Sequence, residues 1–165
     1  MSKNWRDAQQ EMLRAIEKDM LETAALTGRH ALSPAVHDAL RAVPRHKFVR
    51  PEDIALAYKN RPLPIGHGQT ISQPFIVALM SEFLDLPADA KTSANLLEIG
   101  AGCGYQSAVL AELAHDVAAI EIVADIARAS KRRLKRLGYS NVSIRIGDGA
   151  LGWPERAPFD GIIVA

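Results

Sequence analysis

The chain has 165 residues, of which 48% are hydrophobic and 24% charged, and its formal net charge at pH 7 is +1. This length and apolar content suit one domain with a sizeable core, and the balanced charge argues against a dedicated nucleic-acid binder. No apolar run approaches the roughly 18 residues that a membrane-spanning helix needs, and the polar start of the chain does not resemble a signal peptide, so we expect a cytoplasmic protein with no membrane partner.

The first part of the chain is expected to be mainly helical. Apolar residues at helical spacing predict an amphipathic helix over residues 5–27, with Gly28 as a suitable stop. Ser33 followed by Pro34 is typical of an N-cap and a first helical position, which predicts a second helix that runs until Pro44. The stretch that follows has no regular period and is expected to be irregular.

A proline- and glycine-rich stretch, residues 61–68, is predicted to be an extended loop because it has no hydrophobic period. A further helix is expected over residues 75–84. If Pro74 is its first helical position, Gln73 is the N-cap and Ser72 immediately precedes the cap.

The second part of the chain alternates apolar, strand-like segments with helical ones, which is typical of an α/β fold with a doubly wound parallel sheet. The strand-like segments begin at Leu96, Val117, Val142 and Gly161. We therefore expect the first half of a Rossmann-like sheet, with about four parallel strands. Residues 1–90 would form the helical region and its loop, residues 91–165 the half sheet, and both together one domain.

The first strand-like segment runs into a glycine-rich loop that reads Glu98-x-Gly100-x-Gly102-x-Gly104. This spacing differs from the G-x-G-x-x-G of dinucleotide-binding loops. A carboxylate at the end of the strand would repel a pyrophosphate, but it would attract a ligand that carries an ammonium group and a sulfonium. The loop therefore predicts S-adenosylmethionine as the cofactor.

Two more carboxylates follow the next strand-like segments. Glu121 lies about 20 residues beyond the first glycine of the loop, where an acidic residue accepts the ribose hydroxyls of a nucleotide. Ile122 comes next and is assigned to the same pocket, and Asp148 with Gly149 follows the third segment. Alternatively, each carboxylate only caps a helix or turn. Capping alone explains less well why three carboxylates follow three successive strands.

Several strings of the sequence stand as in one family of enzymes. They are VPRHKFV from Val43, PLPIGHGQTISQP from Pro62, the glycine loop, and GDG, GWP and APFD between Gly147 and Asp160. In these strings the chain resembles the protein-L-isoaspartate O-methyltransferases, from about Leu32 to its last residue. The string GQTISQP is specific to that family, whereas the glycine loop alone would indicate only some methyltransferase.

The resemblance implies transfer of a methyl group from S-adenosylmethionine to the free α-carboxylate of L-isoaspartyl residues in damaged proteins and peptides, which are then its partners. A carboxylate with a pKa of about 4 is already ionised at neutral pH, so no general base is needed and catalysis becomes positioning. The full-length protein is expected to be a monomer.

The resemblance also implies that Ser72 is the active-site serine, with Thr70, Gln69 and Gln73 as substrate contacts. Alternatives remain from the residues themselves. Ser72 can be an ordinary residue near a helix start, and the two amides can serve hydrogen bonds of the loop itself.

Other polar features are interpreted as structural. The basic run from Lys131 to Arg136 is expected to be the solvated face of a helix rather than an RNA-binding surface. Cys103 is the single cysteine; it is expected to pack, although a thiol at a helix start can have a lowered pKa. The five histidines show no pairing at helical spacing, so no metal site is expected.

Members of the family continue beyond the point that corresponds to Ala165. We therefore expect the chain to lack a C-terminal part, which would leave its fourth strand as an apolar edge prone to association. Two alternative functions stay open: another S-adenosylmethionine-dependent methyltransferase, and a non-catalytic fragment that only binds the cofactor.

Overall fold

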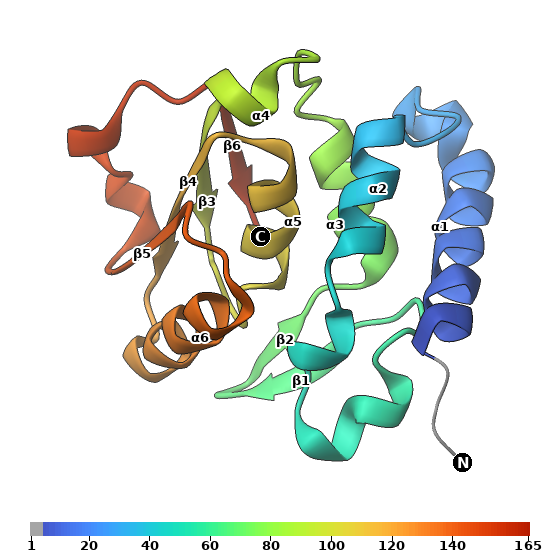
Figure 1. The fold of residues 1–165 in the computed structure, drawn as a ribbon, viewed down its shortest axis with the longest axis horizontal. Coiled ribbons are helices and arrows are strands. Elements are labelled where there is room, and N and C mark those ends of the chain that lie inside the picture. The colour runs from blue at the N-terminus through green and yellow to red at the C-terminus, as the bar shows by residue number, and fades with distance from the viewer. Residues whose placement is uncertain (1–4) are drawn as a thin grey trace. The chain divides into compact units, whose positions relative to one another are not determined.

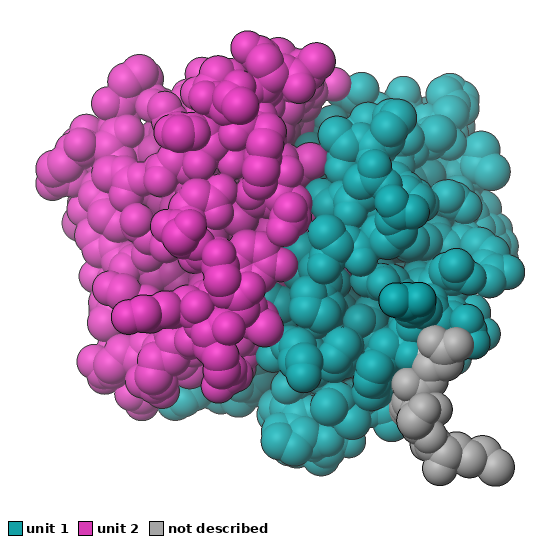
Figure 2. All heavy atoms as spheres, in the orientation of Figure 1, with its two compact units in different colours: residues 1–83 teal, residues 84–165 magenta. Residues whose placement is uncertain are grey.

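The structure, a computed structural model, describes residues 5–165. The chain forms two compact units, Met1–Phe83 and Leu84–Ala165, which are coloured separately in Figure 2. The boundary that the sequence predicts at residue 90, and the grouping of both parts into one domain, stay predictions.

The first unit contains three packed helices, α1 (Trp5–Thr27), α2 (Pro34–Ala42) and α3 (Pro74–Glu82), seen in Figure 1. The helix predicted over residues 5–27 is confirmed, and it buries Met12, Ile16 and Met20 along one stripe. Gly28 follows with φ +69°, a left-handed conformation that suits a helix stop.

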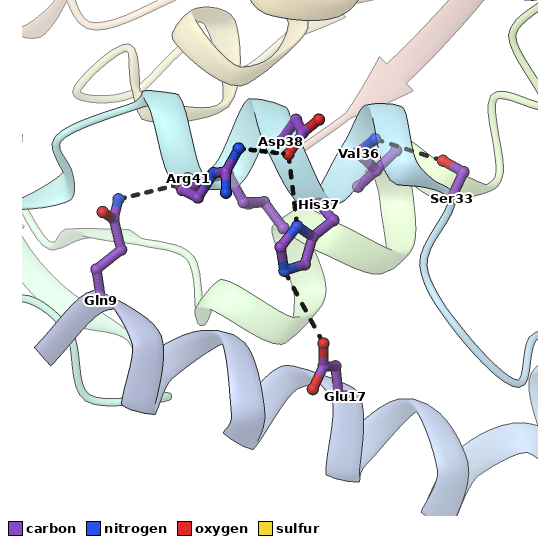
Figure 3. Close-up of polar contacts among 8 residues, drawn as sticks. Gln9, Glu17, Ser33, Val36, His37, Asp38 and Arg41 are labelled. Atoms are coloured by element: carbon purple, nitrogen blue, oxygen red, sulfur yellow. Dashed lines mark hydrogen bonds and ion pairs between the residues drawn. The ribbon is translucent and has the colours of Figure 1, made fainter. Parts of the chain in front are cut away.

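The start of α2 follows its sequence signal. The Ser33 hydroxyl accepts a hydrogen bond from the Val36 N–H at 3.4 Å, and Pro34 occupies the first turn. At the other end, the side chain of Gln9 on α1, labelled in Figure 3, donates to the carbonyl of Leu40 at 3.3 Å. A side chain from α1 thus serves one of the carbonyls that a helix end leaves without an internal partner.

Residues 61–68 are not a simple extended loop, so that prediction is wrong. Strands β1 (Leu63–Gly66) and β2 (Gln69–Ile71) form a short antiparallel hairpin, in which Leu63 pairs with Ile71. The turn contains His67 and Gly68, both at positive φ (52° and 70°), as two-residue hairpin turns require. Two strands of three and four residues are too short to show a clear alternation of apolar and polar side chains.

Two 3-10 helices, Arg45–Lys47 and Pro51–Leu56, connect α2 to this hairpin. The prediction of an irregular stretch agrees with these short helices, because a 3-10 helix lacks the 3.6-residue period of an α-helix.

The second unit is built on a four-stranded sheet of β3 (Asn95–Ile99), β4 (Asp116–Glu121), β5 (Val142–Ile146) and β6 (Gly161–Val164). The strand order is β5-β4-β3-β6 and all pairs are parallel, which confirms the predicted α/β architecture. Short helices are also present: α4 (Ala90–Ser93), and 3-10 turns at Gly149–Leu151 and Pro154–Arg156.

Helices α5 (Tyr105–Leu113) and α6 (Ala124–Leu137) make the crossovers between β3, β4 and β5 (Figure 1). The face of the sheet formed by Leu97, Ala118 and Ile120 packs against Trp153 and Phe159. The chain moves from β3 outward to β5 and then returns to the other side of β3. This reversal of strand order marks the place where open α/β sheets bind their ligands, at the carboxyl ends of the strands.

Candidate functional site

The glycine loop lies at the carboxyl end of β3. Gly100, Gly102 and Gly104 all have positive φ (88°, 51° and 85°), a region that residues with a Cβ rarely adopt. The N–H groups of Gly100 and Ala101 donate to the carbonyl of Ile120 at 2.8 and 3.0 Å, which brings the loop across the end of β4. Packing adds to this requirement, because a Cβ at Gly100 would lie 2.5 Å from the Ala165 carbonyl oxygen and one at Gly104 would lie 3.1 Å from Cδ1 of Leu134.

Glu121, the last residue of β4, holds this loop in place. One carboxylate oxygen accepts from the Gly102 N–H at 2.8 Å, and the other accepts from the Val123 N–H at 2.8 Å. The side chain is largely buried, with 6% of the residue exposed. Each oxygen can still accept a further hydrogen bond, so ligand hydroxyls are not excluded by these contacts.

The sequence predicted that Glu98 lies at the open end of its strand, and this prediction is wrong. Glu98 is the residue before the last of β3, it is fully buried, and the Ser107 hydroxyl of α5 donates to its Oε2. The strand extends to Ile99, and α5 covers the face that Glu98 occupies. Burial raises the pKa of Glu98 to about 8; the Ser107 hydrogen bond opposes this rise and the negative charge of Glu121 adds to it.

Asp148 and Gly149 follow β5 and lie beside the end of β4, because the Gly147 N–H donates to the Glu121 carbonyl at 3.1 Å. The Asp148 carboxylate accepts from the Ala150 N–H at 2.9 Å, so it caps the short turn that follows, as the structural alternative held. Gly149 packs tightly, since a Cβ there would lie 2.2 Å from Cγ2 of Ile99.

Two apolar side chains are exposed at the same edge. Ile122, directly after β4, is 68% exposed, and Ile146, which pairs with Glu121 in the sheet, is 47% exposed. The predicted cofactor residues of the second unit are thus together at the carboxyl ends of β3, β4 and β5, with Glu98 buried beneath them.

Two residues that the sequence did not predict support the glycine loop. The Ser130 hydroxyl of α6 donates to the Gly102 carbonyl, and the Arg133 guanidinium donates to the Cys103 carbonyl at 2.8 Å. Arg133 belongs to the basic run interpreted as a solvated face, and its neighbours Lys131 and Arg132 are indeed exposed. Cys103 itself is buried.

The predicted substrate residues lie in the first unit. Gln69 and Thr70 are exposed on β2, and Ser72 and Gln73 are partly buried between β2 and α3. Gln73 is the N-cap of α3, as expected, but its side chain makes no capping hydrogen bond. Its amide instead donates to the Asp19 carboxylate at 3.5 Å, which agrees with a role within the protein. Within residues 5–165, the Ser72 hydroxyl makes no hydrogen bond.

A surface pocket of about 330 Å³ opens between α6 and the start of β5, where Leu134, Tyr139 and Val142 contribute to its lining. Parallel strands have their amino ends at the edge of the sheet opposite to the glycine loop. This pocket is therefore separate from the predicted site residues.

Among residues 5–165, no group of three histidine, cysteine, aspartate or glutamate side chains is arranged to hold a metal ion. Over the same residues, none of the helices has the length and apolar character that crossing a membrane requires.

Known proteins resemble the chain over nearly all of its length. A protein-L-isoaspartate O-methyltransferase 2 of Syntrophobacter fumaroxidans is 50% identical over 157 residues, which are 95% of this chain and 62% of the relative. One of Nitrosococcus oceani is 49% identical over 154 residues, 93% of this chain and 68% of the relative. The chain thus spans about three fifths to two thirds of the length of these curated relatives.

A solved protein-L-isoaspartate O-methyltransferase structure superposes with a TM-score of 0.77 at 28% identity, over 94% of this chain and 47% of that one. The sequence profile of the family described as protein-L-isoaspartate(D-aspartate) O-methyltransferase matches residues 16–165. The matched region includes both the Ser72 segment and the glycine loop, and on this basis the chain belongs to the protein-L-isoaspartate(D-aspartate) O-methyltransferase family.

Proposed function

We propose that the protein transfers a methyl group from S-adenosylmethionine to the free α-carboxylate of L-isoaspartyl residues in damaged proteins and peptides. The observation that carries this proposal is the glycine loop, tied by Glu121 at the switch point of the sheet, in a chain of this family. A protein of similar fold from Plasmodium falciparum, 21% identical to this chain, was solved in complex with S-adenosyl-L-homocysteine, the product that methyl transfer leaves behind.

The residues at the carboxyl edge fit S-adenosylmethionine. Positive-φ glycines form a tight turn at this edge, Glu121 offers oxygens for ribose hydroxyls, and the exposed Ile122 offers an apolar surface for an adenine ring. The residues that we propose around the cofactor are Gly100, Gly102, Gly104, Glu121, Ile122, Asp148 and Gly149, with Glu98 buried beneath them as support for the end of β3. When bound, this cofactor supplies a methyl group on a positively charged sulfur.

On the substrate side, the attacking oxygen belongs to a carboxylate that is ionised at neutral pH, so no residue has to remove a proton from it. We assign the Ser72 hydroxyl to donate a hydrogen bond to that carboxylate, because it has no partner within residues 5–165 that would compete. Gln69, Thr70 and Gln73 would contact the peptide on either side of it. Orientation of this kind contributes to rate by alignment alone.

We further propose isoaspartyl-containing proteins and peptides as partners, a monomeric full-length protein with no nucleic-acid partner, and a cytoplasmic location. The net charge of +1 supports the absence of a nucleic-acid partner, and the single cysteine agrees with a reducing compartment.

The decisive experiment measures transfer of labelled methyl groups from S-adenosylmethionine to an isoaspartyl peptide, with the matching aspartyl peptide as control. We expect methylation of the isoaspartyl peptide only. Ser72→Ala should lower kcat/KM for that peptide roughly tenfold or more, with cofactor affinity and melting temperature nearly unchanged. Ser140→Ala, at an exposed serine, is the matched control. A lower melting temperature with normal activity per folded molecule would contradict the role of Ser72.

A further inference from the structure

Arg45 is a fully buried arginine in the first unit whose guanidinium reaches the Ser72 backbone. Its Nη2 donates to the Ser72 carbonyl at 2.8 Å, and its Nε donates to the Ala57 carbonyl at 2.8 Å. A longer contact of 3.5 Å joins Nη2 to the Arg61 carbonyl. One side chain therefore connects the end of a 3-10 helix, the start of the hairpin and the Ser72 segment.

This arrangement strongly constrains the backbone. A guanidinium remains protonated in proteins, and burying it is costly unless its N–H groups are satisfied. Hydrogen bonds from a charged donor are stronger than those from a neutral one, and the planar guanidinium fixes the directions in which it donates. The Ser72 carbonyl is thus held in one orientation relative to residues 57–61.

Asn60 holds the same segment from its other end. Its Oδ1 accepts from the Phe75 N–H at 3.0 Å, in the first turn of α3, where the side chain of the N-cap residue Gln73 makes no such bond. Its Nδ2 donates to the Asp19 carboxylate of α1 at 2.7 Å. Because Asp19 can only accept when ionised, it directs the amide nitrogen toward itself and leaves the amide oxygen for Phe75.

We propose that Arg45 and Asn60 are positioning residues that hold the backbone from Ser72 to Phe75 so that the Ser72 hydroxyl is presented to the substrate carboxylate. The inference rests on the proposed function of Ser72. Arg45 fixes the carbonyl of Ser72, Asn60 fixes the N–H three residues later, and Pro74 between them has a restricted φ. With the backbone held, the side-chain rotation of Ser72 is the main freedom left at this position.

The test compares Arg45→Lys and Asn60→Ala with the unchanged protein. A lysine keeps the charge, but its single ammonium group cannot reproduce the planar pattern of donors. We expect each variant to lower kcat/KM for an isoaspartyl peptide tenfold or more at temperatures well below its melting point, with the Kd for S-adenosylmethionine changed less than twofold. Arg50→Lys is the matched control, since Arg50 pairs with Asp53 and does not contact the Ser72 segment.

A rescue experiment separates positioning from general damage. Asn60→Asp keeps an acceptor for Phe75 but places two carboxylates together, and Asp19→Asn in the same chain restores a donor and an acceptor. We expect the double variant to recover most of the kcat/KM that Asn60→Asp loses. The proposal would be overturned if the double variant did not recover kcat/KM. It would also be overturned if Arg45→Lys and Asn60→Ala both folded and kept kcat/KM within twofold of the unchanged protein.

Amide hydrogen exchange of Phe75 gives a readout that does not need activity. We expect faster exchange of this amide in Asn60→Ala and in Arg45→Lys, and unchanged exchange in Arg50→Lys. If the unchanged protein does not methylate the peptide, the proposed function fails, and unchanged Phe75 exchange would then separately overturn the holding role of Arg45 and Asn60. If Arg45→Lys does not fold, Asn60→Ala and the rescue pair decide the outcome.

Discussion

Two fully buried residues, Arg45 and Glu98, carry charge in water and are accommodated in opposite ways. Arg45 remains charged and is surrounded by carbonyl oxygens of its own unit. Glu98 accepts a hydrogen bond from the Ser107 hydroxyl through Oε2. Because burial raises its pKa to about 8, Glu98 is mainly protonated at neutral pH.

The raised pKa predicts a specific dependence of stability on pH. Between the ordinary value of 4.5 and about 8, the folded protein keeps a proton that the unfolded chain has lost. The contribution of Glu98 to the free energy of unfolding therefore falls as pH rises through this window. Glu98→Gln has no such titration, so we expect its stability relative to the unchanged protein to increase from pH 5 to pH 8.

Urea denaturation at several pH values measures this difference. Glu155→Gln, at a glutamate whose side chain is 73% exposed, serves as the control and should show a much smaller change. Parallel stability profiles for Glu98→Gln and the unchanged protein would contradict the protonated state of Glu98.

At the scale of elements, two glycines at helix ends separate the cost of backbone conformation from the cost of packing. Gly104 at the start of α5 and Gly138 at the end of α6 have nearly equal φ, 85° and 88°. A Cβ at Gly104 would lie 3.1 Å from Cδ1 of Leu134, whereas one at Gly138 would have nothing within 4 Å. We expect Gly138→Ala to cost about 1 kcal/mol, mostly from positive φ, and Gly104→Ala to cost more. Equal losses in chemical denaturation would show that Leu134 moves freely.

The elements that the sequence predicts correctly are those with strong local signals. The helix over residues 5–27 has a long apolar stripe, and the cap at Ser33 acts on a residue three positions away. The hairpin was missed because its pairing depends on a turn in which His67, a non-glycine residue, takes a positive φ. Sequence alone gives little indication of such a turn when the strands beside it are so short.

At the scale of the whole molecule, the sequence predicts one part of the candidate site and not the other. The glycine loop and Glu121 could be predicted because each lies at the end of an apolar strand. The contacts of Arg45 with Ser72 and of Asp19 with Asn60 span 27 and 41 residues of sequence, so no local pattern indicates them. A fully buried arginine is also rare enough that a sequence alone favours an exposed one.

The proposed function divides the work between the two units, which a pair of substitutions can test. Glu121→Gln keeps one acceptor oxygen but turns an amide N–H toward a backbone N–H, either that of Gly102 or that of Val123. We expect it to weaken S-adenosylmethionine binding by about 1.5–3 kcal/mol, the size of hydrogen bonds to a charged group. Calorimetry measures this change directly, and unchanged affinity would remove Glu121 from the cofactor site.

Ser72→Ala is expected to affect the reaction of the peptide and not the binding of the cofactor. The free-energy effects of the two substitutions should therefore add. In the double variant, we expect the cofactor Kd of Glu121→Gln alone and, at saturating cofactor, the peptide kcat/KM of Ser72→Ala alone. Additivity within about 0.5 kcal/mol is the usual result for residues that do not share partners. A cofactor Kd that shifts with Ser72→Ala, or a combined loss far from the sum, would mean that the Ser72 segment and the glycine loop do not act as separate binding elements.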